Sequence, residues 1–283
     1  MAMINRTVLL AALCLGVAGC QTNTPGPTVQ SRSDDVRRAF ASAPSMVQGP
    51  ISGADACRGT TVHRGALAGR TLRVNKISDI KLAQKEVVLT FDDGPIPKRT
   101  GAILATLKSY GVGATFFVVG QMARSYPSMV RKVAQDGHTV GHHTNRHANL
   151  RNLSRAAALK EIAQGERAVS KALSGSGQMA APFFRFPYLA HTTALRRALA
   201  ERGTVVIDPD IDSKDYFRQS SDVILRRTMR RLRRKGKGVL LFHDIHARTV
   251  RLMPKLLARL KADGYSVVHL VPARDTACGR PTA

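Results

Sequence analysis

Between residues 86 and 270, short apolar runs alternate with longer amphipathic segments, and this alternation constrains the fold more than any other feature of the chain. Short apolar runs bounded by turn residues are typical of buried strands, whereas apolar residues at helical spacing indicate amphipathic helices. The pattern predicts strands at Glu86–Phe91, Ala114–Val119, Thr139–His142, Phe183–Phe186, Thr204–Ile207, Gly238–Phe242 and Tyr265–Leu270.

Helices are predicted in the intervals between these strands. The first runs from Pro97 to Tyr110, and the second ends at Asp136, each before a glycine that would terminate it. The others are expected at Leu153–Leu173, Thr193–Arg202, Ser220–Arg234 and Thr249–Ala262. Alternating strands and helices form parallel α/β folds. Because only about seven strands are predicted, we expect a single domain that folds as a distorted (β/α)7 barrel rather than a regular eight-fold one.

Five short polar motifs lie at or just after the C-terminal ends of predicted strands, where parallel barrels place their active sites. Together they supply a base, three metal ligands, charged partners and an acid, which is the set that metal-assisted hydrolysis of an unreactive amide requires. The motifs are Thr90-Phe91-Asp92-Asp93-Gly94-Pro95, His143-Thr144-Asn145-Arg146-His147, Arg185-Phe186-Pro187-Tyr188, Asp212-Ser213-Lys214-Asp215-Tyr216 and Leu241-Phe242-His243-Asp244.

Each motif taken singly also has an ordinary structural explanation. Asp-Asp-Gly after an apolar run is often a strand-ending turn, His243 could be a core histidine at a strand end, and Arg185 a surface guanidinium. His143 and His147 are four residues apart, so a helical turn would place both imidazoles within reach of one ion. With one carboxylate they leave a coordination position open for water, as catalytic zinc sites do. The combination is more informative than any member.

An acetamide carbonyl resists attack by water, so a site that hydrolyses it must activate the water and stabilise the oxyanion. A divalent ion does both. In such a reaction Asp92 would take the proton of the water, and His243 would protonate the departing amine. General bases and acids of this kind each contribute about 100- to 10,000-fold to the rate.

The five motifs, in this order, resemble those of the polysaccharide deacetylases of the NodB-homology type, carbohydrate esterase family 4. The resemblance covers roughly residues 87–270 and implies the same distorted barrel. It also implies that Asp92 is the general base, and that Asp93, His143 and His147 are the metal ligands.

The same resemblance implies roles for five further residues. His243 matches the general acid, and Leu241 beside it matches the pocket for the acetyl methyl group. Arg185 matches the residue that holds the base, and Asp215 the one that orients the acid histidine. Tyr188 follows the family's proline, at a position where a backbone N–H helps to bind the oxyanion.

One motif departs slightly from the family pattern. It ends at Tyr216, where the family has Trp or Tyr, and the whole chain contains no Trp. Stacking against a sugar must therefore depend on Tyr188, Tyr216 and the few phenylalanines, which leaves the substrate groove hard to predict.

The N-terminal residues are typical of an exported chain. Arg6 precedes an apolar run, and Val17-Ala18-Gly19-Cys20 closes it with small residues. Residues 1–19 resemble a bacterial lipoprotein signal, cleaved before Cys20, which would carry lipid; the alternative is a plain secretory signal in which Cys20 is incidental. Gln21 rather than Asp follows, so resemblance to sorted lipoproteins favours an outer-membrane anchor facing the periplasm. Residues 20–56 are expected to form a flexible tether.

Cysteine usage agrees with export. Cys14 would leave with the signal and Cys20 would be acylated, so Cys57 and Cys278 remain, one at each end of a predicted domain spanning residues 57–279. We predict a disulfide between them, worth roughly 5 kcal/mol in the chain-entropy model; two unpaired thiols are the alternative. Residues 280–283 are expected to be a tail.

The charge balance is strongly basic, with 44 Lys and Arg against 19 Asp and Glu and a formal net charge of +25. Removing residues 1–19 deletes only Arg6 and leaves about +24. The most basic segment is Arg226, Arg227, Arg230, Arg231, Arg233, Arg234, Lys235 and Lys237. Such a segment is either a solvated helix face or a surface that attracts anionic envelope material. An exported chain with no recognisable nucleic-acid motif makes nucleic acid a poor partner.

The sequence therefore predicts a monomeric, lipid-anchored hydrolase that removes N-acetyl groups from N-acetylglucosamine units with a divalent metal. Zinc is favoured, although His, His, Asp ligation also suits cobalt, nickel or manganese. Peptidoglycan, chitin oligosaccharides and poly-N-acetylglucosamine are all open as substrates. The alternatives are an O-acetyl polysaccharide esterase and a non-catalytic carbohydrate-binding lipoprotein of the envelope.

Overall fold

The computed structural model describes residues 67–273. The predicted signal, the tether and the three cysteines Cys20, Cys57 and Cys278 lie outside the described residues, as does the tail. Lipidation, the disulfide and the domain limits at residues 57 and 279 therefore stay predictions.

One sheet with exclusively parallel pairings forms the centre of the described residues. Its hydrogen-bonded order is β1-β9-β2-β3-β4-β5-β6, while β8 pairs with β2, and β7 with β8. Within residues 67–273 no pairing joins β6 to β7, so the barrel is open. The strands are β1 Ala68–Val74, β2 Glu86–Asp92, β3 Thr115–Val118, β4 Thr139–His142, β5 Phe183–Phe184, β6 Val205–Val206, β7 Ile211–Asp212, β8 Gly238–His243 and β9 Ser266–Pro272.

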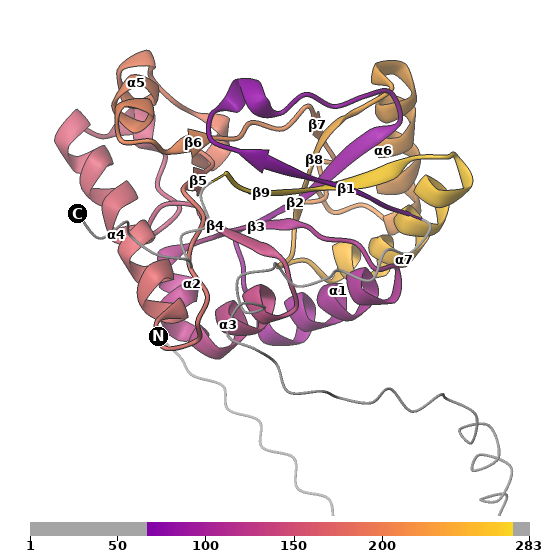
Figure 1. Ribbon diagram of the computed structural model, residues 1–283, viewed down its shortest axis with the longest axis horizontal. Coiled ribbons are helices and arrows are strands. Elements are labelled where there is room, and N and C mark those ends of the chain that lie inside the picture. Colours follow the sequence, from indigo (N-terminus) through magenta and orange to yellow (C-terminus); the bar gives the residue numbers. More distant parts are fainter. Residues whose placement is uncertain (1–66, 274–283) are drawn as a thin grey trace, which may run out of the picture. The chain divides into compact units, whose positions relative to one another are not determined.

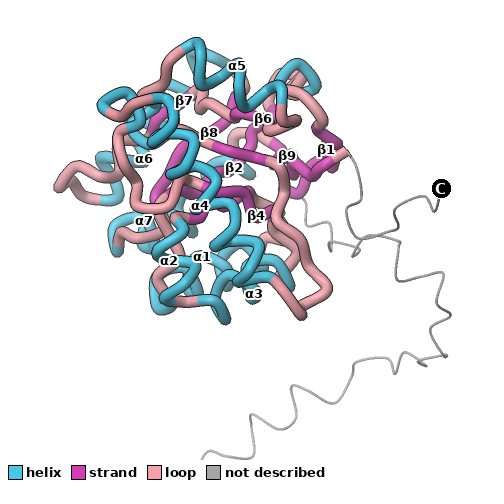
Figure 2. The backbone as a smooth tube through the Cα atoms, turned by 90° about the vertical axis from the view of Figure 1, so that its left-hand side faces the viewer, coloured by secondary structure: helices cyan, strands magenta, loops and turns pink. Residues whose placement is uncertain are grey.

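The helices surround the sheet, and the strands lie at the centre of the fold (Figures 1 and 2). In space α6, α7, α1, α3, α4 and α5 contact one another in that order, and α2 packs on α3 and α4. The helices are α1 Pro97–Ser109, α2 Gly120–Ser125, α3 Pro127–Gln135, α4 Arg155–Leu173, α5 Thr193–Glu201, α6 Ser221–Lys235 and α7 Ala247–Ala262, with short 3-10 turns η3 Ile77–Asp79, η4 Leu150–Asn152 and η5 Pro187–Leu189.

The expected distorted α/β barrel is thus the observed fold, and all seven predicted strands are present. Two further strands, β1 and β7, were not predicted. β1 pairs with β9 and has only one fully buried residue, Val74, so it lacks the apolar run by which the other strands were recognised. β7 is only two residues long and pairs with β8.

The single helix predicted to end at Asp136 is wrong, because the structure has two helices there, α2 and α3. They are separated at Tyr126, whose φ of −134° and ψ of 55° lie outside the helical region. Pro127 follows it and begins α3. A residue before proline is disfavoured in the helical conformation, which explains the break.

The largest cluster of buried apolar side chains joins strands of the sheet to the helices that cover it. Phe91 stacks on Phe116 with ring centroids 4.9 Å apart and contacts Phe242 at 5.9 Å, so β2, β3 and β8 are joined by aromatic packing. This fixes the C-terminal end of β2 relative to its neighbours.

None of the helices within residues 67–273 combines the length and the apolar character needed to cross a bilayer.

Candidate active site

The end of β2 places Asp92 beside a fully buried arginine. Asp92 is 2% exposed and Arg185, which directly follows β5, is 0% exposed. Arg185 Nη1 donates to Asp92 Oδ1 at 2.8 Å and to Thr90 Oγ1 at 2.7 Å, while its Nε donates to the Ile207 carbonyl at 2.8 Å. The Phe117 ring covers the guanidinium, 4.4 Å from its carbon. The carboxylate is therefore held in one orientation by an immobile cation.

Burial raises the pKa of Asp92 above the ordinary value for aspartate, while the charges of Arg185 and His243 and the hydrogen bond from Arg185 act in the opposite direction. A carboxylate with a raised pKa is a better proton acceptor when ionised. Removing one partner of a buried ion pair typically costs about 3–5 kcal/mol, because it leaves the other charge unpaired. Arg185 thus contributes both to the position of Asp92 and to stability.

Next to Asp92, three side chains converge on one point. Asp93 Oδ1 lies 3.3 Å from His147 Nε2 and 3.6 Å from His143 Nε2. The three ligand atoms all lie within 4.8 Å of one another. Ligand atoms about 2.0–2.2 Å from a tetrahedral ion are separated by roughly 3.3–3.6 Å. Asp93, His143 and His147 therefore have the spacing of a three-ligand metal site.

The hydrogen bonding of these residues also fits a metal ion. His143 Nδ1–H donates to the Arg185 carbonyl at 2.7 Å, which leaves the Nε2 lone pair directed at Asp93. Burial lowers the pKa of His143 to about 3, so its imidazole is neutral, as a ligand must be. Asp93 Oδ1 is buried and has no hydrogen-bond partner among the described residues. An unsatisfied buried carboxylate oxygen is costly, and a cation would satisfy it.

The two histidines do not lie on a helical turn, and that expectation is corrected. β4 ends at His142, and residues 143–149 form a loop in which Thr144 has φ 61° and His147 has φ 58°. The backbone therefore reverses twice, instead of coiling, to bring the imidazole rings within 5.0 Å. Left-handed conformations at non-glycine residues cost about 1–3 kcal/mol each and persist where the surroundings enforce them.

On the opposite side of the site, β8 ends at His243. Its Nδ1–H donates to Asp215 Oδ1 at 2.6 Å, and its backbone N–H donates to Asp215 Oδ2 at 2.8 Å. Thr249 Oγ1–H also donates to Oδ2, at 2.6 Å. Burial by itself would lower the pKa of His243, but the hydrogen bond and the charges of Asp215, Asp93 and Asp92 outweigh it and raise the pKa to about 9. The imidazole is accordingly a proton donor at neutral pH.

A cavity of about 440 Å³ joins these groups. Leu241 lies in its wall and is 4% exposed, while Tyr188 and Tyr216 are 67% and 41% exposed at its mouth. The Tyr188 ring packs edge-on against His147, and the Tyr216 ring edge-on against His243. Arg185 and Asp215 lie behind the lining. The lining residues are Asp92, Asp93, His143, His147, Phe186, Tyr188, Leu189, Asp212, Tyr216, Leu241 and His243.

Comparison with known proteins shows which family has sequences similar to this chain. The polysaccharide deacetylase family matches residues 79–207. A chitin deacetylase of Colletotrichum lindemuthianum is 34% identical over 194 residues, which are 64% of this chain and 76% of that protein. The chain belongs to the polysaccharide deacetylase family. Members of this family are metal-dependent hydrolases, as the site's Asp and His set suggests.

Two other relatives of the deacetylase family are longer than the matching region. A peptidoglycan-N-acetylglucosamine deacetylase of Listeria monocytogenes is 30% identical over 198 residues, 69% of this chain and 40% of that protein. The structure of a peptidoglycan deacetylase from Bdellovibrio bacteriovorus aligns with a TM-score of 0.64 and 36% identity, over 76% of this chain and 59% of that one. This chain therefore matches about two fifths of the length of the first of these deacetylases.

Three residues in or around this site were missed by sequence reasoning. Asp212 lines the cavity and accepts from Tyr216 Oη–H at 2.9 Å. Asp244 is buried, accepts from Thr100 Oγ1–H at 2.5 Å, and has its pKa raised to about 7, chiefly by burial. Asp212 and Asp244 belong to two of the five motifs, but their sequence context offered no reason to assign either of them a role. Thr249 lies outside all five motifs and had no signal.

Arginines of α6 hold the segment that carries Asp212 and Asp215. Arg227 Nη2 donates to the Ser213 carbonyl at 2.7 Å and to the Lys214 carbonyl at 3.0 Å, and Arg231 Nη1 donates to the Asp212 carbonyl at 2.9 Å. Part of the basic segment therefore has a structural role, which neither interpretation of its charge anticipated.

Proposed function

We propose that this chain hydrolyses the N-acetyl groups of N-acetylglucosamine units in a polysaccharide or oligosaccharide. The observation that carries the proposal is the arrangement around one cavity of a fixed carboxylate, a three-ligand set and a charged histidine. These are Asp92 with Arg185, the group Asp93, His143 and His147, and His243 with Asp215. Amide hydrolysis needs a base, an oxyanion stabiliser and an acid, and the cavity has all three.

In the proposed reaction Asp92 Oδ2 takes a proton from the attacking water, while Oδ1 stays bound to Arg185. His243 Nε2–H then donates its proton to the nitrogen of the departing amine, because an unprotonated amine is a poor leaving group. Asp215 keeps the imidazole charged until that step. His243 Nε2 lies 4.0 Å from Asp93 Oδ2, so the acid stands beside the three-ligand set.

Asp93, His143 and His147 would hold the divalent ion. When bound, the ion would lower the pKa of water at the site and polarise the acetyl carbonyl. Zinc is the metal we favour, with cobalt, nickel and manganese as alternatives of the same ligand chemistry. The backbone N–H of Tyr188 is proposed as a further oxyanion donor, and Leu241 as the contact of the acetyl methyl group.

Peptidoglycan is the substrate that the relatives from Listeria and Bdellovibrio favour, whereas the fungal relative acts on chitin. Tyr188 and Tyr216 stand exposed on opposite sides of the cavity, as stacking surfaces for sugars flanking the reacting residue would. Poly-N-acetylglucosamine offers the same rings and stays a further candidate substrate.

Two rival functions share the same cavity. An O-acetyl esterase would use the same base and ion but would depend less on a charged His243, because an alkoxide leaves more readily than the amide anion that an unprotonated nitrogen would form. A carbohydrate-binding protein would need neither Asp92 nor the three-ligand set. The hydrogen bond of His243 to Asp215, together with its raised pKa, fits the proton donor that the N-deacetylase needs.

We also propose that the protein is exported and anchored through lipid on Cys20, with the catalytic domain in the periplasm and the outer membrane as the favoured site. The support is the sequence of residues 1–21. Mass spectrometry of the protein extracted from membranes tests this: a diacylated or triacylated N-terminal Cys20 is expected. A mature chain that begins elsewhere and carries no lipid would contradict the anchor.

The test of the proposed activity is acetate release from chitopentaose and from purified peptidoglycan, measured side by side. Enzyme stripped with a chelator should release no acetate, and addition of zinc or cobalt should restore release from at least one substrate. An O-acetylated glycan serves as the third substrate. Acetate from that glycan alone would replace the N-deacetylase by the esterase, and no acetate from any substrate, with metal bound, would favour the binding protein.

A further inference from the structure

The loop that carries His143 and His147 has a backbone that its own residues do not favour. Thr144, which is β-branched, and His147 both lie in the left-handed region. Within the loop, His147 N–H donates to Thr144 Oγ1 at 3.0 Å. The remaining constraints come from two helices that pack on the loop, α2 and α4.

The N-terminal part of α2 fixes the first half of the loop. Gly120 N–H donates to the Thr144 carbonyl and Gln121 N–H to the Asn145 carbonyl, both at 2.9 Å. Arg124 Nη2 donates to Asn145 Oδ1 at 2.7 Å. The Gln121 contact therefore holds the carbonyl side of the peptide bond that joins Asn145 and Arg146.

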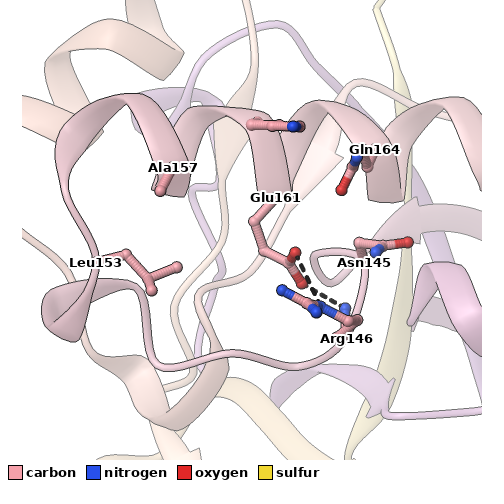
Figure 3. A pocket seen from close by; sticks show the side chains of 7 residues that line it. Asn145, Arg146, Leu153, Ala157, Glu161 and Gln164 are labelled. Carbon is pink, nitrogen blue, oxygen red and sulfur yellow. Dashed lines mark hydrogen bonds and ion pairs between the residues drawn. The ribbon is translucent and has the colours of Figure 1, made fainter.

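Glu161 of α4 reaches that peptide. Its side chain points from the helix to the loop, and Oε1 accepts from the backbone N–H of Arg146 at 2.5 Å (Figure 3). Oε2 lies 3.5 Å from Nε of the same residue. The Glu161 side chain is only 4% exposed, whereas that of Arg146 is 65% exposed. Burying a carboxylate is expensive, so the position of this one needs an explanation.

One turn further along α4, Gly165 allows the helix to approach the same loop closely. A Cβ at residue 165 would lie 2.3 Å from the carbonyl carbon and oxygen of Thr144, which is too close for any side chain. Glu161 and Gly165 are four residues apart, so they present one face of α4 to the loop. The close approach and the buried carboxylate thus act on the same segment.

We propose that Glu161 is a positioning residue for the metal site: its carboxylate fixes the peptide bond between Asn145 and Arg146, one residue before His147, so that the His147 imidazole meets the point shared by Asp93 and His143. It acts through the loop and touches neither substrate nor ion. The role rests on the proposed metal-dependent function, but its effect is on metal affinity and does not require turnover. Groups behind the ligands of a metal site commonly change its affinity about 10- to 100-fold.

Zinc affinity, measured by competition with a chromophoric chelator and without substrate, tests the role. Glu161→Ala should weaken zinc binding about 10- to 100-fold. Glu161→Gln keeps an oxygen that can accept from the Arg146 N–H, so it should recover most of that loss. Glu166→Gln, on the exposed side of the same helix, is the matched control and should bind zinc as the wild type does. The melting temperature of each metal-free protein is recorded in parallel.

Three results would overturn the inference. One is unchanged zinc affinity in Glu161→Ala, whatever its melting temperature. The second is a loss in Arg146→Ala as large as in Glu161→Ala, since Arg146→Ala keeps the backbone N–H and removes only the guanidinium. If Glu161→Ala does not fold, the third is a folded Gly165→Ala variant that binds zinc as the wild type does, because a Cβ at residue 165 must displace the same loop. A wild type that binds zinc but releases no acetate would reject the proposed function and leave this inference intact.

Discussion

Two adjacent aspartates have different environments in this site because the chain turns between them. Asp92 is the last residue of β2 and points to the buried Arg185. Asp93 has φ 76°, which turns its carboxylate away from that pair and toward His143 and His147. One residue is thereby suited to accept a proton and the next to bind a cation. At the residue scale, backbone direction separates two identical side chains into two roles.

The activity should fall on the alkaline side as His243 loses its proton. The pKa of His243 is raised to about 9, so the acid is charged at neutral pH, and a bound dication would move that limb to somewhat lower pH. Asp215→Asn removes the main raising charge and should move the alkaline limb of kcat/KM down by about one pH unit or more. An alkaline limb at the same pH in Asp215→Asn would show that another group donates the proton.

His143→Ala should lower the metal content of the purified protein, because it removes one of three ligand atoms that meet at Asp93. The measurement is the ratio of zinc to protein by elemental analysis after dialysis against a limiting amount of metal. His138→Ala is a useful comparison, since that histidine is buried outside the site and bonded to Ala114 N–H. An unchanged ratio in His143→Ala would remove this residue from the metal site.

Much of the site could be predicted from sequence because its members stand in short motifs at strand ends, and the end of a parallel strand fixes where a side chain points. The pairing of Asp92 with Arg185, and of Asp215 with His243, was implied by the family resemblance of these motifs. The path of residues 143–147 could not be predicted, because two left-handed residues cancel the helical geometry that a four-residue spacing suggests. Glu161 had no signal, since a buried Glu on a helix looks like a surface residue in sequence.

At the scale of elements, α6 connects charge to site geometry. One face carries Ile224, Met229 and Leu232 into the core. On its flank Arg227 and Arg231 donate to carbonyl groups of the segment after β7. The helix thus packs and at the same time holds the segment that carries the partner of His243.

Arg227→Ala should loosen the segment that carries Asp215 and Tyr216. A hydrogen bond that involves a charged group contributes about 1.5–3 kcal/mol. We therefore expect a comparable loss in the free energy of unfolding, and a lower kcat because Asp215 is held less firmly. Urea denaturation and steady-state kinetics measure the two effects. Arg230→Ala, on the exposed face of the same helix, should change neither. Equal behaviour of the two variants would mean that the carbonyl contacts do not matter.

The elements themselves were predictable in proportion to their apolar patterns. β2 has six consecutive buried residues and β8 has five, so their apolar runs stand out in the sequence. β1 is mostly exposed and β7 consists of two residues, so neither has a pattern to detect. The break at Tyr126 was signalled by Pro127, which also suits the first turn of a helix. A proline can interrupt one helix or begin the next, and only the packing of α2 and α3 decides between these two alternatives.

At the scale of the whole molecule, the described part of the basic segment has more positive side chains than ion-pair partners for them. Some cations of the basic segment have partners: Arg233 pairs with Asp263 and Lys235 with Asp210. Arg226, Arg230 and Arg234 are exposed, lie four residues apart on α6, and have no ion pair among the described residues. Like charges at this spacing destabilise a helix slightly, which favours a role in attracting anionic material.

Association with purified anionic sacculi should therefore weaken as ionic strength rises. Binding is measured by co-sedimentation with Asp92→Asn, so that the substrate is not altered during the assay. Replacement of Arg226, Arg230 and Arg234 by Ser should reduce retention at low salt and flatten the salt dependence, since exposed charges are screened within about 10 Å at 0.1 M. Retention that does not vary with salt would make the basic surface a bystander.

The most direct test of the account compares acetate release by wild type and Asp92→Asn, both loaded with zinc to the same measured occupancy. Asp92 lies beside the three ligands but is not one of them, so the variant should keep its metal and lose its base. We expect a loss of at least about 100-fold in kcat, as for removal of a general base. Undiminished acetate release by fully loaded Asp92→Asn would contradict the proposed mechanism.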